Sequence, residues 1–152
     1  MSCKFHCNLY DIPMSETEIN AYESHVNRLT INTKEEYFLI FSDGDVPTEN
    51  FQEVFEALLT AMDSHPYKKL LIDIEKMKST TLGGRTWLVL NFVPRFYSKY
   101  EGIYEVAIVN TKNFFEGITI DLLAKAVMAL GFNINITFHK NVGECKRRLG
   151  VN

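Results

Sequence analysis

The sequence lacks long apolar runs, dense positive charge and an even set of cysteines, and each absence excludes a class of protein. No stretch approaches the roughly 18 apolar residues of a membrane span, and no basic, then apolar leader opens the chain, so we expect a soluble cytoplasmic protein. The net charge of −3 argues against nucleic acid as a partner. The three cysteines, Cys3, Cys7 and Cys145, favour reduced thiols over disulfides.

Metal-binding patterns are also scarce. Cys3, His6 and Cys7 have residue types that suit zinc, with His139 or Cys145 as a remote fourth ligand. Structural zinc sites usually draw on a second close pair of ligands, and the sequence contains none. We therefore expect neither a metal nor a cofactor, and interpret the cluster as incidental thiols near the terminus.

Catalytic patterns are equally weak. Asp73 and Glu75 would form a carboxylate pair on one face only if their strand continued through Glu75, and a solvated strand end is the simpler interpretation. The pair Gly83–Gly84 lacks the spacing and the lysine of a phosphate-binding loop. None of the histidines is expected near Asp73: His6, His25, His65 and His139. We therefore predict that the protein is not an enzyme.

The apolar run Lys69–Ile74 is the strongest strand pattern and predicts the centre of a sheet buried on both faces. Asp73 would lie near its carboxyl end, where open α/β sheets usually place functional loops. Similar patterns predict further strands: residues 26–31, Tyr37–Phe41, Tyr104–Val109 and Asn133–Phe138. The first two of these should form an antiparallel hairpin.

Helical periodicity separates these strands. Asp43–Asp45 predicts a turn, and Thr48 a helix N-cap. The following stripe has helical spacing throughout: Phe51, Val54, Phe55, Leu58, Leu59 and Met62. A second helix should span Leu82–Tyr100, kinked or split by Pro94.

Two more helices complete the pattern. One should bury a stripe and end at Gly131, in a left-handed turn. Its apolar residues are Leu122, Leu123, Ala126, Val127 and Leu130. The last helix should be capped by Asn141 with Glu144, and bury Val142, Cys145 and Leu149.

The N-terminal part is harder to interpret. Residues 1–14 fit either an edge strand or an ordered tail, and residues 15–18 have capping-box spacing that predicts a short helix with Ile19 and Tyr22 on its apolar face. The length suits one domain, residues 1–152. The expected fold class is α/β, with a mixed, mostly parallel sheet, an antiparallel edge hairpin and about four helices.

The order and spacing of certain segments resemble a known family. These segments are Tyr37–Phe41, Gly44, Val46–Thr48, Leu70–Ile74, Val106–Val109 and Ile136–Phe138. The chain is similar to the STAS superfamily, the fold of anti-sigma-factor antagonists and of the cytoplasmic domains of sulfate transporters. It resembles most the SpoIIAA-like branch, also described as STAS/SEC14-like. The resemblance covers about residues 36–150 and leaves residues 1–32 as an N-terminal extension or edge hairpin.

The resemblance implies a regulatory loop. In phosphorylatable members an Asp-Ser pair precedes a glycine at a helix start, and a partner kinase modifies the serine. Here Thr81 and Leu82 stand near those positions, so the serine itself is missing. Three hydroxyls could substitute, with Arg85 favouring phosphate in the first helical turn: Ser79, Thr80 and Thr81. The simpler interpretation is that Thr80 or Thr81 only caps the helix.

Aromatic residues crowd the second predicted helix. They are Trp87, Phe92, Phe96, Tyr97 and Tyr100. Part of this set must cover the sheet. The rest could form an isologous homodimer face, or line a pocket for a small apolar ligand or lipid between helix and sheet.

We therefore predict a bacterial, non-enzymatic regulatory module that binds a protein partner or a second copy of itself. Its partner-binding loop would comprise Asp73, Ser79, Thr80, Thr81 and Arg85. The alternative is a carrier or sensor that holds an apolar ligand beside the aromatic helix.

Overall fold

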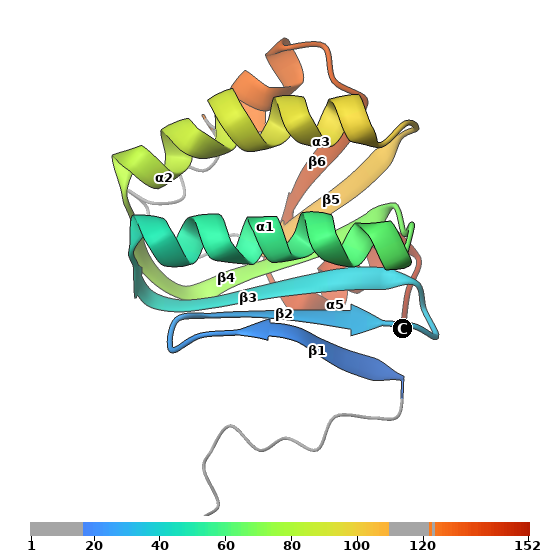
Figure 1. Ribbon diagram of the computed structural model, residues 1–152. Helices are drawn as coiled ribbons and strands as arrows, with labels where there is room; N and C mark the ends of the chain where they lie inside the picture. Colours follow the sequence, from blue (N-terminus) through green and yellow to red (C-terminus); the bar gives the residue numbers. More distant parts are fainter. Residues whose placement is uncertain (1–16, 110–121, 123) are drawn as a thin grey trace, which may run out of the picture.

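Six strands form one sheet in the part of the chain that the computed structural model describes, residues 17–109, 122 and 124–152 (Figure 1). The strands lie in sequence order, antiparallel from β1 to β3 and parallel from β3 to β6. Their bounds are β1 (Glu18–Glu23), β2 (Asn27–Asn32), β3 (Tyr37–Val46), β4 (Lys69–Thr80), β5 (Tyr104–Val109) and β6 (Ile134–His139). This confirms the predicted mixed α/β sheet with an antiparallel edge.

Helices cover both faces of this sheet. The helical elements are α1 (Thr48–Ser64), α2 (Leu82–Trp87), the π-helical segment η1 (Leu88–Phe92), α3 (Val93–Lys99) and α5 (Val142–Leu149). Residues 122 and 124–129 are also helical. Helix α1 and the continuous rod of α2, η1 and α3 lie on one face, and α5 lies on the other (Figure 1).

Helix α1 forms because its apolar residues recur at helical spacing, and the predicted stripe is buried. Phe51, Val54, Phe55, Leu58 and Met62 are each at most 8% exposed. Burying such a side chain contributes about 1.5–3 kcal/mol, so this stripe fixes α1 on the sheet. The predicted N-cap was one residue off: Pro47 is the N-cap and Thr48 begins the helix.

Pro94 determines the shape of the second helical rod. Because proline lacks an N–H and its ring crowds the carbonyl four residues before it, a regular α-helix cannot continue through it undisturbed. The rod widens just ahead of Pro94, where the Val93 N–H donates to the Leu88 carbonyl across a π-helical turn. The predicted interruption therefore takes the form of a π segment.

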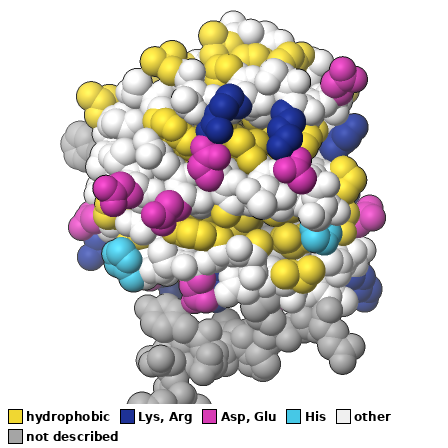
Figure 2. Space-filling view, viewed as in Figure 1, with side chains coloured by type: hydrophobic (Ala, Val, Ile, Leu, Met, Phe, Trp, Pro, Cys, Tyr) yellow, Lys and Arg dark blue, Asp and Glu magenta, His cyan; other side chains and the backbone are white. Residues whose placement is uncertain are grey.

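Exposed ion pairs connect this rod to α1. Arg95 pairs with Glu56, and the Lys99 ammonium lies 2.8 Å from the Asp63 carboxylate. Figure 2 shows basic side chains beside acidic ones on this face, with hydrophobic surface between them. Lys99, and to a lesser degree Tyr100, hold the pKa of Asp63 below its ordinary value.

Strand β4 is longer than predicted. Residues 75–80 were predicted as part of a loop, yet they continue the strand and pair with β3 as far as Thr80. Twice along this pairing β4 carries one extra residue relative to β3, first between Asp73 and Lys76 and again between Met77 and Ser79. Each bulge interrupts the two-residue alternation that identifies a strand in sequence.

The prediction of a turn at Asp43–Asp45 is likewise wrong, because these residues belong to β3. Gly44 has φ of 74°, a left-handed conformation that glycine adopts readily, and it lies beside the second bulge. The glycine-containing segment therefore bends a strand pair instead of ending it.

The helix predicted after residues 15–18 is also wrong. Residues 18–23 form β1, which pairs antiparallel with β2 along the sheet edge. Tyr22 packs against the core and donates a hydrogen bond to Glu53, while Ile19 stays 43% exposed. Residues 1–14, including the possible edge strand and the cysteine-histidine cluster, lie outside the described residues.

The C-terminal elements match the prediction in part. Asn141 caps α5 by accepting from the Glu144 N–H at 2.9 Å, and Cys145 and Leu149 are buried as expected. Gly131 has the expected left-handed φ of 79°. In the preceding helical segment Val127 is buried, but three residues of the predicted stripe are exposed: Leu122, Ala126 and Leu130. Leu123 lies outside the described residues.

Candidate functional site

The predicted regulatory residues meet where the β3–β4 pair ends and α1 and α2 begin. We call this group the junction: Asp45, Thr48, Ser79, Thr80, Thr81 and Arg85. The Ser79 hydroxyl donates to the Asp45 carboxylate at 2.6 Å. The Thr81 hydroxyl oxygen accepts from the Gly84 N–H at 3.0 Å and also contacts the Thr48 hydroxyl. These bonds tie the two strands to the starts of the two helices.

Arg85 is held inside the junction. Its guanidinium donates to the Thr80 carbonyl at 3.0 Å and to the Thr80 hydroxyl at 2.8 Å. Thr80 is 8% exposed, and both bonds come from the same guanidinium nitrogen, Nη1. Arg85 therefore stabilises the bend between β4 and α2.

Thr81 caps α2, as the simpler of the two interpretations predicted. Unlike the buried Thr80, it is exposed, and its neighbour Leu82 is 73% exposed. Phosphorylation of Ser79, Thr80 or Thr81 stays a prediction.

Asp73 does not belong to the junction, although it was predicted in the same loop. It pairs in register with Val109 of β5, seven residues before Thr80, and lies within electrostatic reach of Cys145 on α5. Burial raises the pKa of Asp73, with Glu75 adding to the effect and the Glu75 N–H opposing it. Burial, Asp73 and Glu144 together raise the pKa of the Cys145 thiol to about 11, so this cysteine is an inert core residue.

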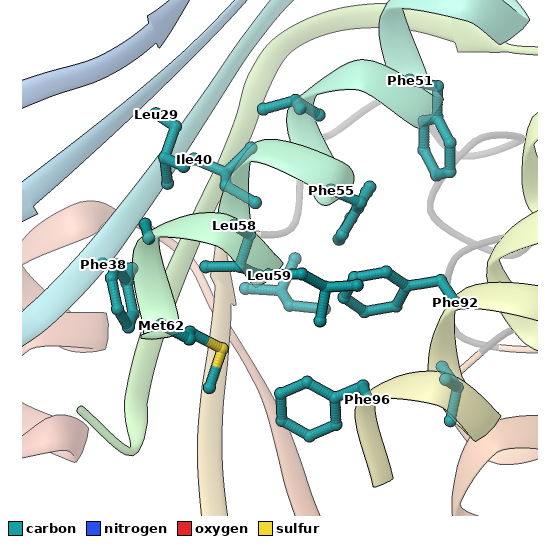
Figure 3. Packing of buried hydrophobic residues seen from close by; sticks show 14 of the residues in the cluster. Leu29, Phe38, Ile40, Phe51, Phe55, Leu58, Leu59, Met62, Phe92 and Phe96 are labelled. Carbon is teal, nitrogen blue, oxygen red and sulfur yellow. The ribbon is translucent and has the colours of Figure 1, made fainter. Parts of the chain in front are cut away.

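The aromatic set divides between interior and surface. Phe92 and Phe96 are 6% and 7% exposed, and Figure 3 shows them pointing toward the side chains of α1. Trp87 and Tyr100 are half-buried against the core, and Tyr97 is 36% exposed with its ring 4.5 Å from that of Phe132. Trp87, Tyr97 and Tyr100 are thus the members that reach the surface.

A cavity of about 140 Å³ lies between these helices and the sheet. Phe92 and Phe96 contribute to its wall, where the alternative interpretation placed an apolar pocket. The sheet side of this pocket was also expected, but the wall that α1 provides was not predicted. The helical stripe of α1 could have indicated this wall, because its residues face the same side of the sheet.

Other classes of site find no support in the described ranges. No group of three or more His, Cys, Asp and Glu residues there could hold a metal ion. Cys3, His6 and Cys7 lie outside these ranges. Among the same residues, no helix is both long and apolar enough to cross a membrane.

Comparison with solved structures identifies the architecture. An uncharacterised DUF3478-family protein from Shewanella loihica PV-4, described as having a SpoIIAA-like fold, aligns with a TM-score of 0.56 and 15% identity, over 84% of this chain and 98% of its own. This chain has the SpoIIAA-like fold. Two further SpoIIAA-like comparisons agree. The unphosphorylated anti-sigma factor antagonist SpoIIAA aligns with a TM-score of 0.52 and 14% identity, over 82% of this chain and 97% of its own.

The protein TM1081 aligns over 91% of this SpoIIAA-like chain and 100% of its own, with a TM-score of 0.55 and 11% identity. The sequence matches no protein-family model and no curated protein. Identities this low establish the SpoIIAA-like fold, and the function must be argued from the residues of this chain.

Proposed function

We propose that this protein is a STAS-type regulatory module that binds another protein through its junction and catalyses no reaction. One similar structure, SpoIIAA, is described as an anti-sigma factor antagonist. In the described part of the chain the junction hydroxyls bond to a carboxylate, a backbone N–H, a guanidinium and one another. This arrangement supports rigidity, because each of these hydroxyls is already engaged by a partner within the protein.

The observation that carries the proposal is the exposed Leu82 on this rigid support. Leu82 begins α2 and is 73% exposed, although Thr81 before it is bonded and Gly84 after it is buried. A large apolar side chain on a fixed frame gains contact area on binding without losing much conformational freedom. Protein interfaces depend on such anchors, surrounded by polar groups like those of the junction.

The test is site-specific photo-crosslinking in the cells that naturally produce the protein. A crosslinker at position 82 should capture one defined protein, and a crosslinker at position 103 should not. Ile103 is a matched control because it is 60% exposed and precedes β5, at the opposite end of the parallel strands. Capture of a second copy of the chain would identify the partner as itself.

Affinity then separates a specific contact from a chance one. Leu82→Glu should weaken binding of the purified partner by roughly tenfold or more, the scale expected for an interface anchor. Ile103→Glu should leave the affinity unchanged. Equal effects of both substitutions, or no captured protein at position 82, would contradict the proposal.

A further inference from the structure

The two faces of the sheet are covered unequally. On the α5 face Leu71 of β4 and Ala107 of β5 are fully buried, at 0% exposure. Their neighbours on the other face, Leu70, Ile72 and Val106, are only partly buried, although both strands lie inside the sheet. Interior strands normally bury both faces when helices cover them. The partial exposure of Leu70, Ile72 and Val106 therefore indicates that side chains do not completely fill the space between the sheet and the helices α1 and α3.

The cavity of about 140 Å³ accounts for this exposure. The cavity is partly open to solvent, and its volume is comparable to that of engineered cavities that bind benzene. Its wall combines apolar strand residues with aromatic rings from two helices, including Phe55, Phe92 and Phe96. The Phe55 and Phe92 rings meet edge to face, 5.0 Å apart, a geometry that also favours an aromatic guest.

A lysine borders this apolar wall. Lys68 is among the residues that line the cavity, and it lies just before β4 begins at Lys69. The Lys68 ammonium lies against Gly102, so a Cβ at position 102 would collide with it. Lys68 is exposed and makes no ion pair within the described ranges, so its charge is available to a ligand.

We propose that the cavity binds a small carboxylic acid with a ring-sized apolar body, which occupies the cavity while the carboxylate contacts Lys68. The apolar wall provides contact area without competing polar groups. The lysine provides one charge-assisted hydrogen bond that orients the molecule. This site is separate from the junction, so the proposal does not depend on the proposed function.

The probes are phenylacetate and its neutral counterpart 2-phenylethanol. Trp87, the only tryptophan of the chain, reports on the cavity because its ring lies 5.9 Å from that of Phe92, so its fluorescence can follow each titration. Phenylacetate should bind roughly tenfold more tightly than 2-phenylethanol, as expected for an added charged hydrogen bond. Absence of saturable binding by either probe would overturn the proposal.

Lysine variants test the charge. Lys68→Met should reduce phenylacetate affinity to that of 2-phenylethanol and leave the alcohol unaffected. Lys69→Met is the matched control: Lys69 also borders the cavity, but its ammonium lies about 4.0 Å from where Gly150, at the end of α5, would carry a Cβ. If Lys68→Met left both affinities unchanged, the carboxylate assignment would be wrong.

Filling variants test the cavity. Ile72→Phe should abolish binding of both probes and raise Tm, because the larger side chain fills empty space. Val106→Ile is a smaller change that should weaken binding if Ile72→Phe does not fold. Leu82→Glu should bind phenylacetate like the wild type, which separates this site from the junction. Unchanged binding in a folded filling variant would place the probe elsewhere and refute the proposal.

Discussion

The Tyr100 hydroxyl lies 2.8 Å from both the Leu59 carbonyl and the Asp63 carboxylate, and so joins the end of α3 to the end of α1. The neighbouring ion pairs Arg95–Glu56 and Lys99–Asp63 bridge the same helices at about half exposure. Exposed ion pairs contribute little because water competes for both charges. The half-buried tyrosine is therefore the polar group expected to stabilise this contact most.

Tyr100→Phe removes only that hydroxyl. We expect a loss of about 0.5–1.5 kcal/mol of unfolding free energy, measured by urea denaturation, because one shared hydrogen bond is lost. Tyr97→Phe is the control: the Tyr97 hydroxyl makes no hydrogen bond in the described ranges, and its removal should change stability by less than about 0.5 kcal/mol. Equal losses in the two variants would show that the interhelical bond contributes nothing.

The adjacent glycines of α2 should respond to alanine in opposite ways. A Cβ at Gly83 would meet Thr48 at an ordinary 3.5 Å, so Gly83→Ala should stabilise the helix by about 0.5–1 kcal/mol. A Cβ at Gly84 would lie 3.2 Å from both the Phe51 ring and the Thr81 hydroxyl oxygen. Gly84→Ala should therefore destabilise the protein by about 1–3 kcal/mol. Thermal and urea unfolding of both variants test this, and stabilisation by Gly84→Ala would contradict the close packing of α2 on α1.

Asp73 should make stability depend on pH in a defined direction. Burial raises its pKa in the folded protein, so its protonated form is favoured there. Its stabilising contribution is complete below the ordinary aspartate value and is lost as pH rises through the raised one. Asp73→Asn should therefore be more stable than the wild type at pH 7, with a difference that shrinks toward pH 3. Urea midpoints across this range measure it, with exposed Glu101→Gln as control. If the variant were less stable than the wild type at pH 7, the ionised Asp73 carboxylate would be stabilising and the predicted direction would be wrong.

Sequence patterns predicted the elements whose periodicity is uninterrupted. The stripe of α1 and the run Lys69–Ile74 are regular, and both elements formed where expected. Strand β1 was missed because an edge strand is stabilised by backbone pairing with β2, which no pattern of side chains reveals. Its two large apolar residues, Ile19 and Tyr22, fit a helix equally well.

The candidate site was only partly predictable for the same reason. Ser79, Thr81 and Arg85 were selected correctly as neighbours because they are close in sequence. Asp73 was grouped with them because the bulged part of β4 resembles a loop in sequence. A pocket beside the aromatic helix was predicted as one alternative, but its volume and its α1 wall could not be, since they depend on how side chains from separate elements pack together.

The π segment sets the rotational phase of the helical rod. An extra residue in a turn shifts all later side chains by about 100° around the axis relative to a regular α-helix. If Leu88–Phe92 wound as a regular α-helix with no residue removed, Phe96 would turn away from the sheet and a polar neighbour such as Arg95 would turn inward. Deleting one residue of this segment would instead let the Val93 N–H bond to the Leu88 carbonyl across an ordinary α-helical turn and would keep Phe96 facing the sheet, so a one-residue deletion should be tolerated better here than elsewhere in the rod.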